Sequence, residues 1–235
     1  MPAITLTGAD DATDPAALVD IAASRPAGLV EWGVLYSSSR FGQGRYPSRA
    51  RIDEIAKLCT HASSAVFALH ICGSAVRDFI AGCGHVSEVA QAFPRIQVNF
   101  IAPKHDLDAL RERIAERPGR TVITQRNVPN ANLWPLLGDL PNHAMLFDAS
   151  GGRGQECAYW PSIIRGACCG YAGGLGPDNL RTELPRIEAA AAGQITWVDM
   201  ESKLRDARDR FDLARALQCI GIVEDYERER EPAHA

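Results

Sequence analysis

The sequence predicts an α/β protein that folds as a single (β/α)8 barrel (TIM barrel), on three observations. A short apolar run followed by a helical pattern recurs eight times along the 235 residues. This length is near the roughly 250 residues that are typical of the architecture. Glycine-rich turns at residues 149–154 and 173–176 follow two of the apolar runs, at the strand ends where parallel α/β proteins bind ligands.

A doubly wound open sheet is the alternative architecture for this alternation. That fold usually carries a glycine-rich fingerprint after its first strand, whereas here Gly8 is followed by the acidic run Ala9-Asp10-Asp11. No stretch of linker-like composition divides the chain. We therefore predict one barrel domain over residues 1–223 and a loose, charged C-terminal tail over residues 224–235.

The predicted strands are short apolar runs bounded by turn residues. In order, they are expected at residues 3–7, 28–36, 65–72, 95–100, 121–125, 144–148, 166–172 and 195–199. Helical spacing of apolar residues is found between and after them, at residues 14–23, 49–59, 74–80, 86–92, 107–116, 132–137, 180–192 and 206–220.

Local signals support several of these helices. Asp14-Pro15 opens the first helix, because a proline is tolerated where the first-turn N–H has no partner. For the same reason Pro177-Asp178-Asn179 is expected to start the helix after the seventh strand. Apolar residues at helical spacing give the last helix one inward face: Phe211, Ala214, Leu217 and Ile220.

Composition and charge exclude several classes of function. A net charge of −4 gives no electrostatic footprint for nucleic acid or an anionic membrane. The seven cysteines show neither a CxxC pair nor a Cys/His zinc spacing, and no apolar stretch is long enough to span a bilayer. We expect reduced thiols in a cytoplasmic protein, with no metal, no cofactor, no nucleic acid and no membrane partner.

Some polar residues in the predicted strands are candidates for chemistry. Asp148 ends an apolar strand just before a glycine-rich turn, so it is either a catalytic carboxylate or a loop-ordering one. His70 alternates with apolar residues and is expected inside the barrel, as a hydrogen-bonded core residue or as a base. Cys72 on the same strand face is interpreted as a packed thiol. Gln97 and Asn99 either bind substrate or satisfy each other.

Glu31 interrupts an otherwise apolar strand, and a buried carboxylate there needs a partner. Arg40 or Arg45, from the loop after this strand, could supply it. The same two arginines could instead bind a substrate carboxylate in two-point fashion, or lie in a solvated loop.

Six short segments follow one another along the chain in an order that can be compared with known families. They are Ile4-Thr5-Leu6-Thr7-Gly8, Ser38-Ser39-Arg40-Phe41 or Arg45-Tyr46-Pro47-Ser48, Gln97-Val98-Asn99, Leu146-Phe147-Asp148 with Gly151-Gly152-Arg153-Gly154, Gly173-Gly174-Leu175-Gly176-Pro177-Asp178-Asn179, and Val198-Asp199-Met200-Glu201-Ser202-Lys203. In this order they resemble the phosphoribosylanthranilate isomerase family over nearly the whole chain, with the most specific match in the last third.

The resemblance implies an isomerase that carries out an Amadori rearrangement of an aminosugar phosphate. A general acid protonates the ring oxygen, the ring opens, and a general base removes the proton at C2. Asp148 corresponds to the family's acid, but Thr7 stands where the family has its basic cysteine. Because an alkyl hydroxyl has no accessible anion near neutral pH, the reaction is expected to have diverged, with His70 as the best replacement base.

The resemblance also implies a phosphate site. Backbone N–H groups at Gly173 and Gly174 and the helix that follows would suit a phosphate. Glu201 stands on the other side of that cradle, beside Ser202, where the family has a small neutral residue. Lys203 or Arg205 could compensate its charge, or Glu201 could point away. Asp199 is expected to contact substrate or to orient this loop.

Two functional hypotheses follow. The first is a diverged phosphoribosylanthranilate isomerase-like enzyme that performs acid–base chemistry on a small sugar-derived or carbonyl substrate. The second is a barrel that has lost catalysis and binds a metabolite or a protein partner. The sequence is compatible with a monomer or a homodimer.

Overall fold

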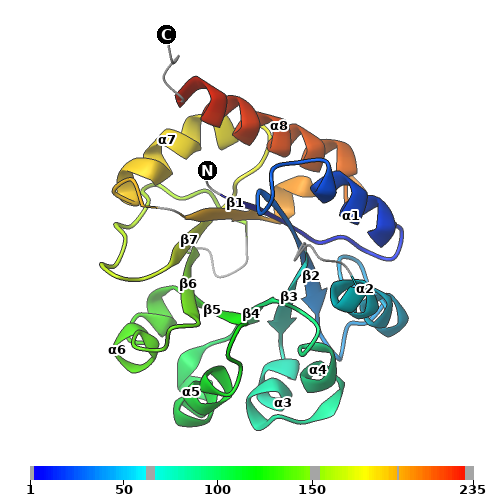
Figure 1. The fold of residues 1–235 in the computed structure, drawn as a ribbon, viewed down its shortest axis with the longest axis vertical. Helices are drawn as coiled ribbons and strands as arrows, with labels where there is room; N and C mark the ends of the chain where they lie inside the picture. Colours follow the sequence, from blue (N-terminus) through cyan, green and yellow to red (C-terminus); the bar gives the residue numbers. More distant parts are fainter. Residues whose placement is uncertain (1–2, 62–66, 149–153, 195, 231–235) are drawn as a thin grey trace.

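The computed structural model describes residues 3–61, 67–148, 154–194 and 196–230, and these residues form a closed parallel barrel (Figure 1). Each strand pairs with the next, and the last pairs with the first. The strands are β1 (Ala3–Thr7), β2 (Val30–Tyr36), β3 (Phe67–Cys72), β4 (Arg95–Asn99), β5 (Thr121–Arg126), β6 (His143–Asp148), β7 (Cys169–Ala172) and β8 (Trp197–Met200). The predicted (β/α)8 barrel is confirmed, and the open sheet is excluded.

The α-helices form a ring outside the strands (Figure 1). They are α1 (Pro15–Ala23), α2 (Arg49–His61), α3 (Ala75–Ala81), α4 (Gly84–Val89), α5 (Leu107–Ala115), α6 (Trp134–Leu137), α7 (Leu180–Ala190) and α8 (Leu213–Arg230). Short 3-10 helices η1 (Ala102–Lys104), η2 (Val128–Asn130) and η3 (Ser202–Leu204) follow β4, β5 and β8. Helix α1 opens at Asp14-Pro15 as predicted, and the Asp14 side chain caps it by accepting a hydrogen bond from the N–H of Ala16.

Side chains alternate between the two sides of each strand, so the barrel has two apolar regions. The larger lies between strands and helices and includes Ile4, Leu6 and Trp32. The smaller lies inside the barrel and consists of Ile123, Ala144, Leu146 and Trp197, with Ala172 packed against it. Most other inward positions carry polar groups, and these make the barrel interior the place to look for a site.

The C-terminal helix corrects two predictions. Helix α8 begins at Leu213 and continues to Arg230, so residues 224–230 are helical instead of a loose tail. Glu224 pairs with Arg25 at 3.0 Å. Of the four residues expected to face inward, only Ile220 is a buried residue of the helix: Phe211 precedes it, and Ala214 and Leu217 are exposed, Leu217 at 37%. The helix buries a different set of residues: Ala216, Cys219, Ile220, Val223 and Tyr226.

Strand β7 and helix α7 are both shorter than predicted. Gly166 lies in a turn with φ of +82°, and the strand begins only at Cys169. The helix after it begins at Leu180, not at Pro177. The Asn179 side chain explains this difference, because its Oδ1 accepts from the N–H of Gly176 and its Nδ2 donates to the carbonyl of Gly174, which fixes a turn ahead of the helix.

Candidate functional site

Glu31 lies near the amino-terminal end of the barrel interior, away from the strand ends where a site was predicted. Its Oε2 lies 3.0 Å from Nε of Arg95, and its Oε1 accepts a hydrogen bond of 2.8 Å from Thr5. The Arg95 guanidinium stacks 4.5 Å from the ring of Trp197. The expected partners Arg40 and Arg45 were therefore wrong, and Glu31 belongs to a closed structural cluster.

A cavity of about 1080 Å³ opens at the carboxyl ends of the strands. We call it the mouth. Its walls come mainly from the loops after β2, β4, β5 and β8: Leu35, Arg40, Gln43, Gly44, Arg45, Tyr46, Cys72, Asn99, Phe100, Ile101, Gln125, Asn127, Val128, Pro129, Glu201 and Asp209. One wall is apolar, including Ile101 and the almost fully exposed Val128, and the opposite wall is charged.

A smaller cavity of about 50 Å³ lies within the barrel and shares Asn99, Gln125 and Glu201 with the mouth. We call it the deep pocket. Its other lining residues are His70, Gln97, Leu146, Asp148, Gly154, Ala172, Gly173, Gly174, Leu175, Asp199, Met200 and Ser202. The structure thus brings together most of the residues that the sequence singled out, from β3, β4, β6, β7 and β8.

Two carboxylates stand at the same level of the deep pocket. Asp148 ends β6 and is paired in register with Ala172 of β7, which is in turn paired with Asp199 of β8. Both acids are buried, at 3% and 6% exposure. The Gln125 side chain donates to Oδ2 of Asp148 at 3.1 Å, a contact that the sequence analysis missed although Gln125 ends a predicted strand.

Asp199 is held by Thr7, whose hydroxyl donates to Oδ1 at 2.9 Å. The pKa of Asp199 is raised to about 8, mainly by burial and also by the charges of Glu201, Glu31 and Asp148, while the hydrogen bond from Thr7 acts in the opposite direction. Thr7 is therefore a hydrogen-bond donor to a carboxyl group that can hold its proton at neutral pH. It carries no base of its own.

His70 lies inside the barrel as predicted, with only 2% of its surface exposed. Burial lowers its pKa to about 3, and the charge of Arg95 adds to this effect. A Cβ added at Gly33 would come within 3.0 Å of the His70 ring and 2.1 Å of the Thr7 hydroxyl, so the glycine makes room for both side chains. His70 is a neutral imidazole of low basicity, which weakens the prediction that it replaces the base.

The amide side chains of Gln97 and Asn99 on β4 form one hydrogen bond with each other, which leaves some of their hydrogen-bonding groups to other partners. Gln97 Nε2 donates to Asn99 Oδ1 at 3.0 Å, as one of the two interpretations expected. Gln97 Oε1, in contrast, is buried without a hydrogen-bond partner. Asn99 also donates to the sulfur of Cys72 at 3.3 Å, and burial raises the pKa of that thiol to about 11.

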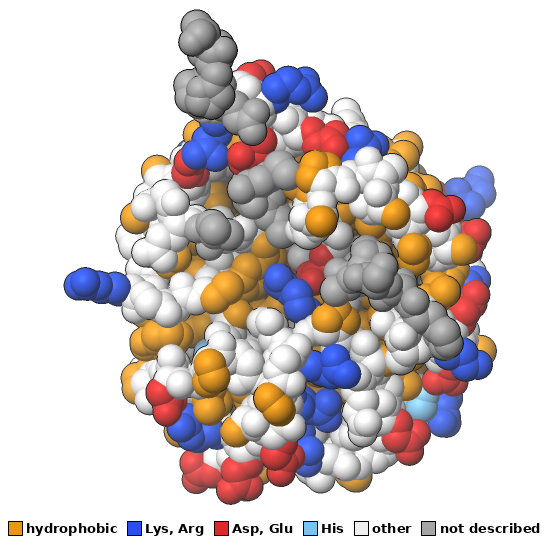
Figure 2. All heavy atoms as spheres, in the orientation of Figure 1, with side chains coloured by type: hydrophobic (Ala, Val, Ile, Leu, Met, Phe, Trp, Pro, Cys, Tyr) orange, Lys and Arg blue, Asp and Glu red, His pale blue; other side chains and the backbone are white. Residues whose placement is uncertain are grey.

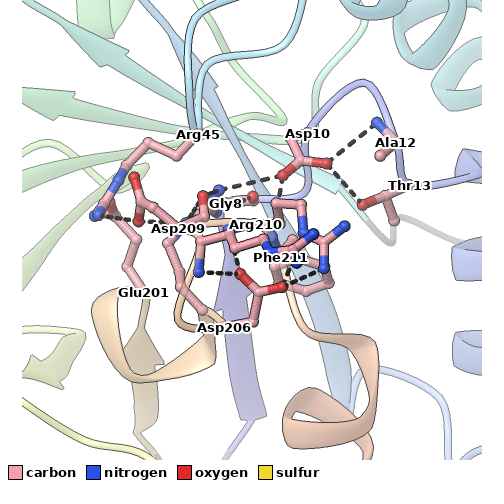
Figure 3. Close-up of polar contacts among 12 residues, drawn as sticks. Gly8, Asp10, Ala12, Thr13, Arg45, Glu201, Asp206, Asp209, Arg210 and Phe211 are labelled. Carbon is pink, nitrogen blue, oxygen red and sulfur yellow. Dashed lines mark hydrogen bonds and ion pairs between the residues drawn. The ribbon is translucent and has the colours of Figure 1, made fainter.

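Glu201 is paired with Arg45 (Figure 3), and not with Lys203 or Arg205, the two partners expected from the sequence. Arg45 approaches Glu201 at 2.5 Å and Asp209 at 2.9 Å. Burial lowers the pKa of Arg45, but the hydrogen bonds and charges of these two carboxylates outweigh it and raise the pKa above the ordinary value. Lys203 pairs instead with Glu156 at 3.1 Å. Arg45 is therefore already neutralised. The exposed Arg40 stacks on the ring of Tyr46, with its guanidinium carbon 5.5 Å from the ring centre.

The loop after β8 is fastened to the loop after β1 by a buried ion pair that was not anticipated. Arg205, whose side chain is 3% exposed, donates to the carbonyl of Gly8 at 2.7 Å and to Asp10 at 3.2 Å. Asp10 also accepts from the backbone N–H groups of Ala12 and Phe211 (Figure 3). The alternative partner proposed for Glu201, Arg205, is thus used to anchor the loop that carries it.

The glycine turn predicted to hold phosphate is in contact with the chain itself. A Cβ at Gly173 would lie 2.4 Å from the sulfur of Cys157, and one at Gly174 would lie 2.7 Å from the backbone nitrogen of Glu156. Ser202 lies against Gly154 in the same way. Residues 154–157 thus cover much of the turn. Gly151 and Gly152 lie outside the described residues.

Other features of the described residues bear on partners. No cluster of three or more His, Cys, Asp or Glu side chains in this part of the chain is arranged to hold a metal ion. No helix among the described residues is both long and apolar enough to cross a membrane. All seven cysteines are free thiols. On the face shown in Figure 2, acidic and basic side chains are interspersed around the periphery.

Fold and site together define a parallel (β/α)8 barrel with a polar, acidic pocket at the carboxyl ends of its strands. Neither a family model nor a curated protein matches the sequence. Solved structures match the fold over nearly the whole chain. TrpF from Jonesia denitrificans is 17% identical with a TM-score of 0.64, covering 98% of this chain and 100% of its own.

Two further solved structures are phosphoribosyl anthranilate isomerases. The one from Thermus thermophilus is 15% identical with a TM-score of 0.61, covering 95% of this chain and 99% of its own. The other, bound to reduced 1-(o-carboxyphenylamino)-1-deoxyribulose 5-phosphate, is 16% identical with a TM-score of 0.63, covering 96% of this chain and 100% of its own. The fold is that of phosphoribosylanthranilate isomerase, as the sequence resemblance implied.

Proposed function

We propose that this chain is a phosphoribosylanthranilate isomerase-like enzyme that isomerises a small sugar-derived or carbonyl substrate, and that its reaction has diverged from the parent reaction. The observation that carries the proposal is the pair of buried carboxyl groups, Asp148 and Asp199, at one level of the deep pocket. Isomerisation by proton transfer needs an acid and a base on the same substrate, and two carboxyl groups in different surroundings can supply them.

Asp148 is proposed as the general acid, in line with the resemblance of its strand and turn to the family's motif. Asp199 is proposed as the base, in place of the absent first-strand cysteine. Two features support this role: Asp199 lies beside Thr7, where the cysteine would stand, and its pKa of about 8 makes its ionised form a stronger base than an ordinary carboxylate. Thr7 then acts by orienting Asp199.

We propose that the anion site, like the base, differs from that of the family. Residues 154–157 cover much of the glycine turn, and the space left beside it is about 50 Å³. Glu201 adds a carboxylate to the same pocket. A substrate phosphate is therefore disfavoured at the place where the resemblance would put it.

A thermal-shift screen against a metabolite library tests the proposal. A ligand present at a hundred times its dissociation constant stabilises the folded state by about 2.7 kcal/mol, which is readily measured. Each hit is then incubated with the protein, and isomerisation is followed by NMR. The proposal expects turnover that is lost in Asp148→Asn and in Asp199→Asn. Hits that bind at the mouth but are never converted by the wild type would contradict it.

That last result would support the second candidate, a barrel that binds a metabolite or a partner protein without catalysis. The replacement of the first-strand cysteine by Thr7, engaged with Asp199, is the observation that favours it. Ligand stabilisation that is equal in the wild type and in Asp148→Asn, together with no conversion, would decide for this candidate.

A further inference from the structure

The charge of the deep pocket is unusual for a site expected to bind phosphate. Its described lining contains three acidic side chains, Asp148, Asp199 and Glu201, and neither lysine nor arginine. Arg45 lines the mouth instead and is shared between Glu201 and Asp209. A phosphate would find no cationic side chain among the described lining residues of this pocket, whereas an ammonium group would find carboxyl oxygens that can accept its hydrogen bonds.

An unsatisfied acceptor points to the same conclusion independently. Gln97 is 3% exposed and lines the deep pocket, and its Oε1 is buried without a hydrogen-bond partner. The orientation of the amide is fixed, because Nε2 donates to Asn99. A buried carbonyl oxygen without a partner is costly, so this atom is suited to a ligand that brings an N–H or O–H group.

The size of the pocket and its electrostatics restrict that group further. A volume of about 50 Å³ accommodates a small terminal group and leaves the rest of a ligand to the mouth. Burial and the neighbouring charges of Glu201, Glu31 and Asp148 all raise the pKa of Asp199, so a cation placed here would lower it and recover a carboxylate–cation attraction.

We propose that the deep pocket binds the protonated amino group of its ligand, so that the substrate class is an amino compound such as an amino sugar and not a sugar phosphate. The ammonium group donates to Gln97 Oε1 and faces Asp199 and Glu201, while the hydroxylated remainder extends into the mouth. The inference rests on the proposed function for the location of the site, but its test is a binding measurement.

Three probes with one skeleton test this assignment: 1-amino-1-deoxy-D-sorbitol, D-sorbitol and D-sorbitol 6-phosphate. Binding is measured by NMR titration of the side-chain amides and by calorimetry in buffers of different ionisation enthalpy. We expect the amine to bind at least about tenfold more tightly than sorbitol, a difference of about 1.4 kcal/mol, and the phosphate to bind no more tightly than sorbitol. At pH 7 the amine should release protons from Asp199.

Variants distinguish the effect of the deep-pocket residues on amine binding from the effect of the overall charge of the molecule. Asp199→Asn and Glu201→Gln should each reduce the preference for the amine over sorbitol by tenfold or more, and Gln97→Met should reduce it severalfold. Asp178→Asn is the matched control, because it removes one charge at the same end of the barrel from a side chain that is 71% exposed and pairs with Arg215. The Asp178→Asn variant should prefer the amine over sorbitol to the same extent as the wild type.

Equal affinities for amine and sorbitol, tightest binding of the phosphate, or no amine binding at tens of millimolar would each overturn the proposal. These outcomes would leave the proposed isomerase reaction standing, since that depends on turnover. Conversely, tight amine binding without conversion of any amino compound would support the pocket assignment and count against the reaction.

Discussion

The two ends of the barrel interior treat buried carboxyl groups in opposite ways. At the amino-terminal end, the carboxylate of Glu31 lies 3.0 Å from the guanidinium of Arg95 and accepts a hydrogen bond of 2.8 Å from the hydroxyl of Thr5. At the carboxyl-terminal end, Asp199 has the hydroxyl of Thr7, and its pKa is raised to about 8. Similar acids on one barrel surface thus differ in surroundings: Glu31, which has a cationic partner, is a structural anchor, and Asp199, held by a hydroxyl, is the one proposed to transfer a proton.

The amino-terminal end of the barrel interior is filled by a packed ion pair, whereas the acidic pocket lies at the other end. The cluster of Glu31 and Arg95, with Trp197 stacked on the guanidinium, closes the opposite end. A Cβ at Gly170 would lie 2.1 Å from the Trp197 ring, so this glycine is what allows the indole to fill the interior. Stability and chemistry are therefore assigned to different ends of the same eight strands.

The largest expected effect is on catalytic activity, where Asp148 at the carboxyl-terminal end should matter and Glu31 at the amino-terminal end should not. Asp148→Asn keeps the side-chain shape but removes the transferable proton, so kcat on an identified substrate should fall by about 10²- to 10⁴-fold, with little change in binding. Glu31→Gln should change kcat by less than about threefold. Steady-state kinetics on both variants check this, and full activity in Asp148→Asn would assign that residue to structure alone.

The second largest expected effect is on stability, where Glu31 should matter more than Asp148. Glu31→Gln leaves the Arg95 charge without its partner and should lower the free energy of unfolding by about 2 kcal/mol; the cost stays below that of a fully buried pair because the Arg95 side chain is 25% exposed. Urea denaturation measures it. Asp148→Asn should stay within about 1 kcal/mol of the wild type. A larger loss in Asp148→Asn than in Glu31→Gln would contradict the division of roles.

A pH series tests Asp199. Its folded-state pKa is raised from 3.8 to about 8, so the stability that its protonated form contributes is lost as the pH rises through 8. His70, with a pKa lowered from 6.5 to about 3, contributes the opposite slope, but only below pH 6.5. Between pH 6.5 and 8 the wild type should therefore lose stability, by at most about 2 kcal/mol.

Asp199→Asn should abolish that decline, because the amide does not titrate. Thermal unfolding at matched ionic strength shows it as a flat melting temperature above pH 6.5. An unchanged decline in the variant would mean that another group titrates in this window and that Asp199 is ionised in the folded protein.

The smallest expected effect concerns Glu201. Glu201→Ser removes a carboxylate that lines both cavities, so affinity for phosphate-bearing ligands should rise by about tenfold or less, because the side chain is 26% exposed and already paired with Arg45. Neutral ligands should be unaffected. Calorimetry with sorbitol 6-phosphate and sorbitol makes the comparison. An unchanged phosphate affinity would show that the carboxylate points away from the bound anion.

The fold was predictable from the sequence because the apolar periodicity of strands and helices is a local signal. Strand β2 differed from its prediction by two residues at its start, and β6 by one. Element ends determined by side-chain hydrogen bonds were less predictable. Asn179 delays the start of α7, and the true register of α8 exposes Leu217, which periodicity alone had placed inside.

The site was predictable in composition but not in pairing. Polar residues at strand ends, such as His70, Asp148 and Asp199, do line one pocket. Their partners come from distant parts of the chain. Glu31 takes Arg95 from two strands away, and Glu201 takes Arg45 from a loop 156 residues earlier. Which arginine reaches which acid depends on barrel register and loop conformation, neither of which has a local sequence signal.

The most direct test of the central claim is turnover of phosphoribosylanthranilate itself, followed by fluorescence beside an authentic isomerase. This barrel keeps the fold, and we propose that it has a different base and an acidic pocket in place of the phosphate site. We therefore expect little or no turnover by the wild type, with Thr7→Cys raising any trace activity. Turnover by the wild type on the order of 10 per second, the rate of an ordinary enzyme, would contradict it.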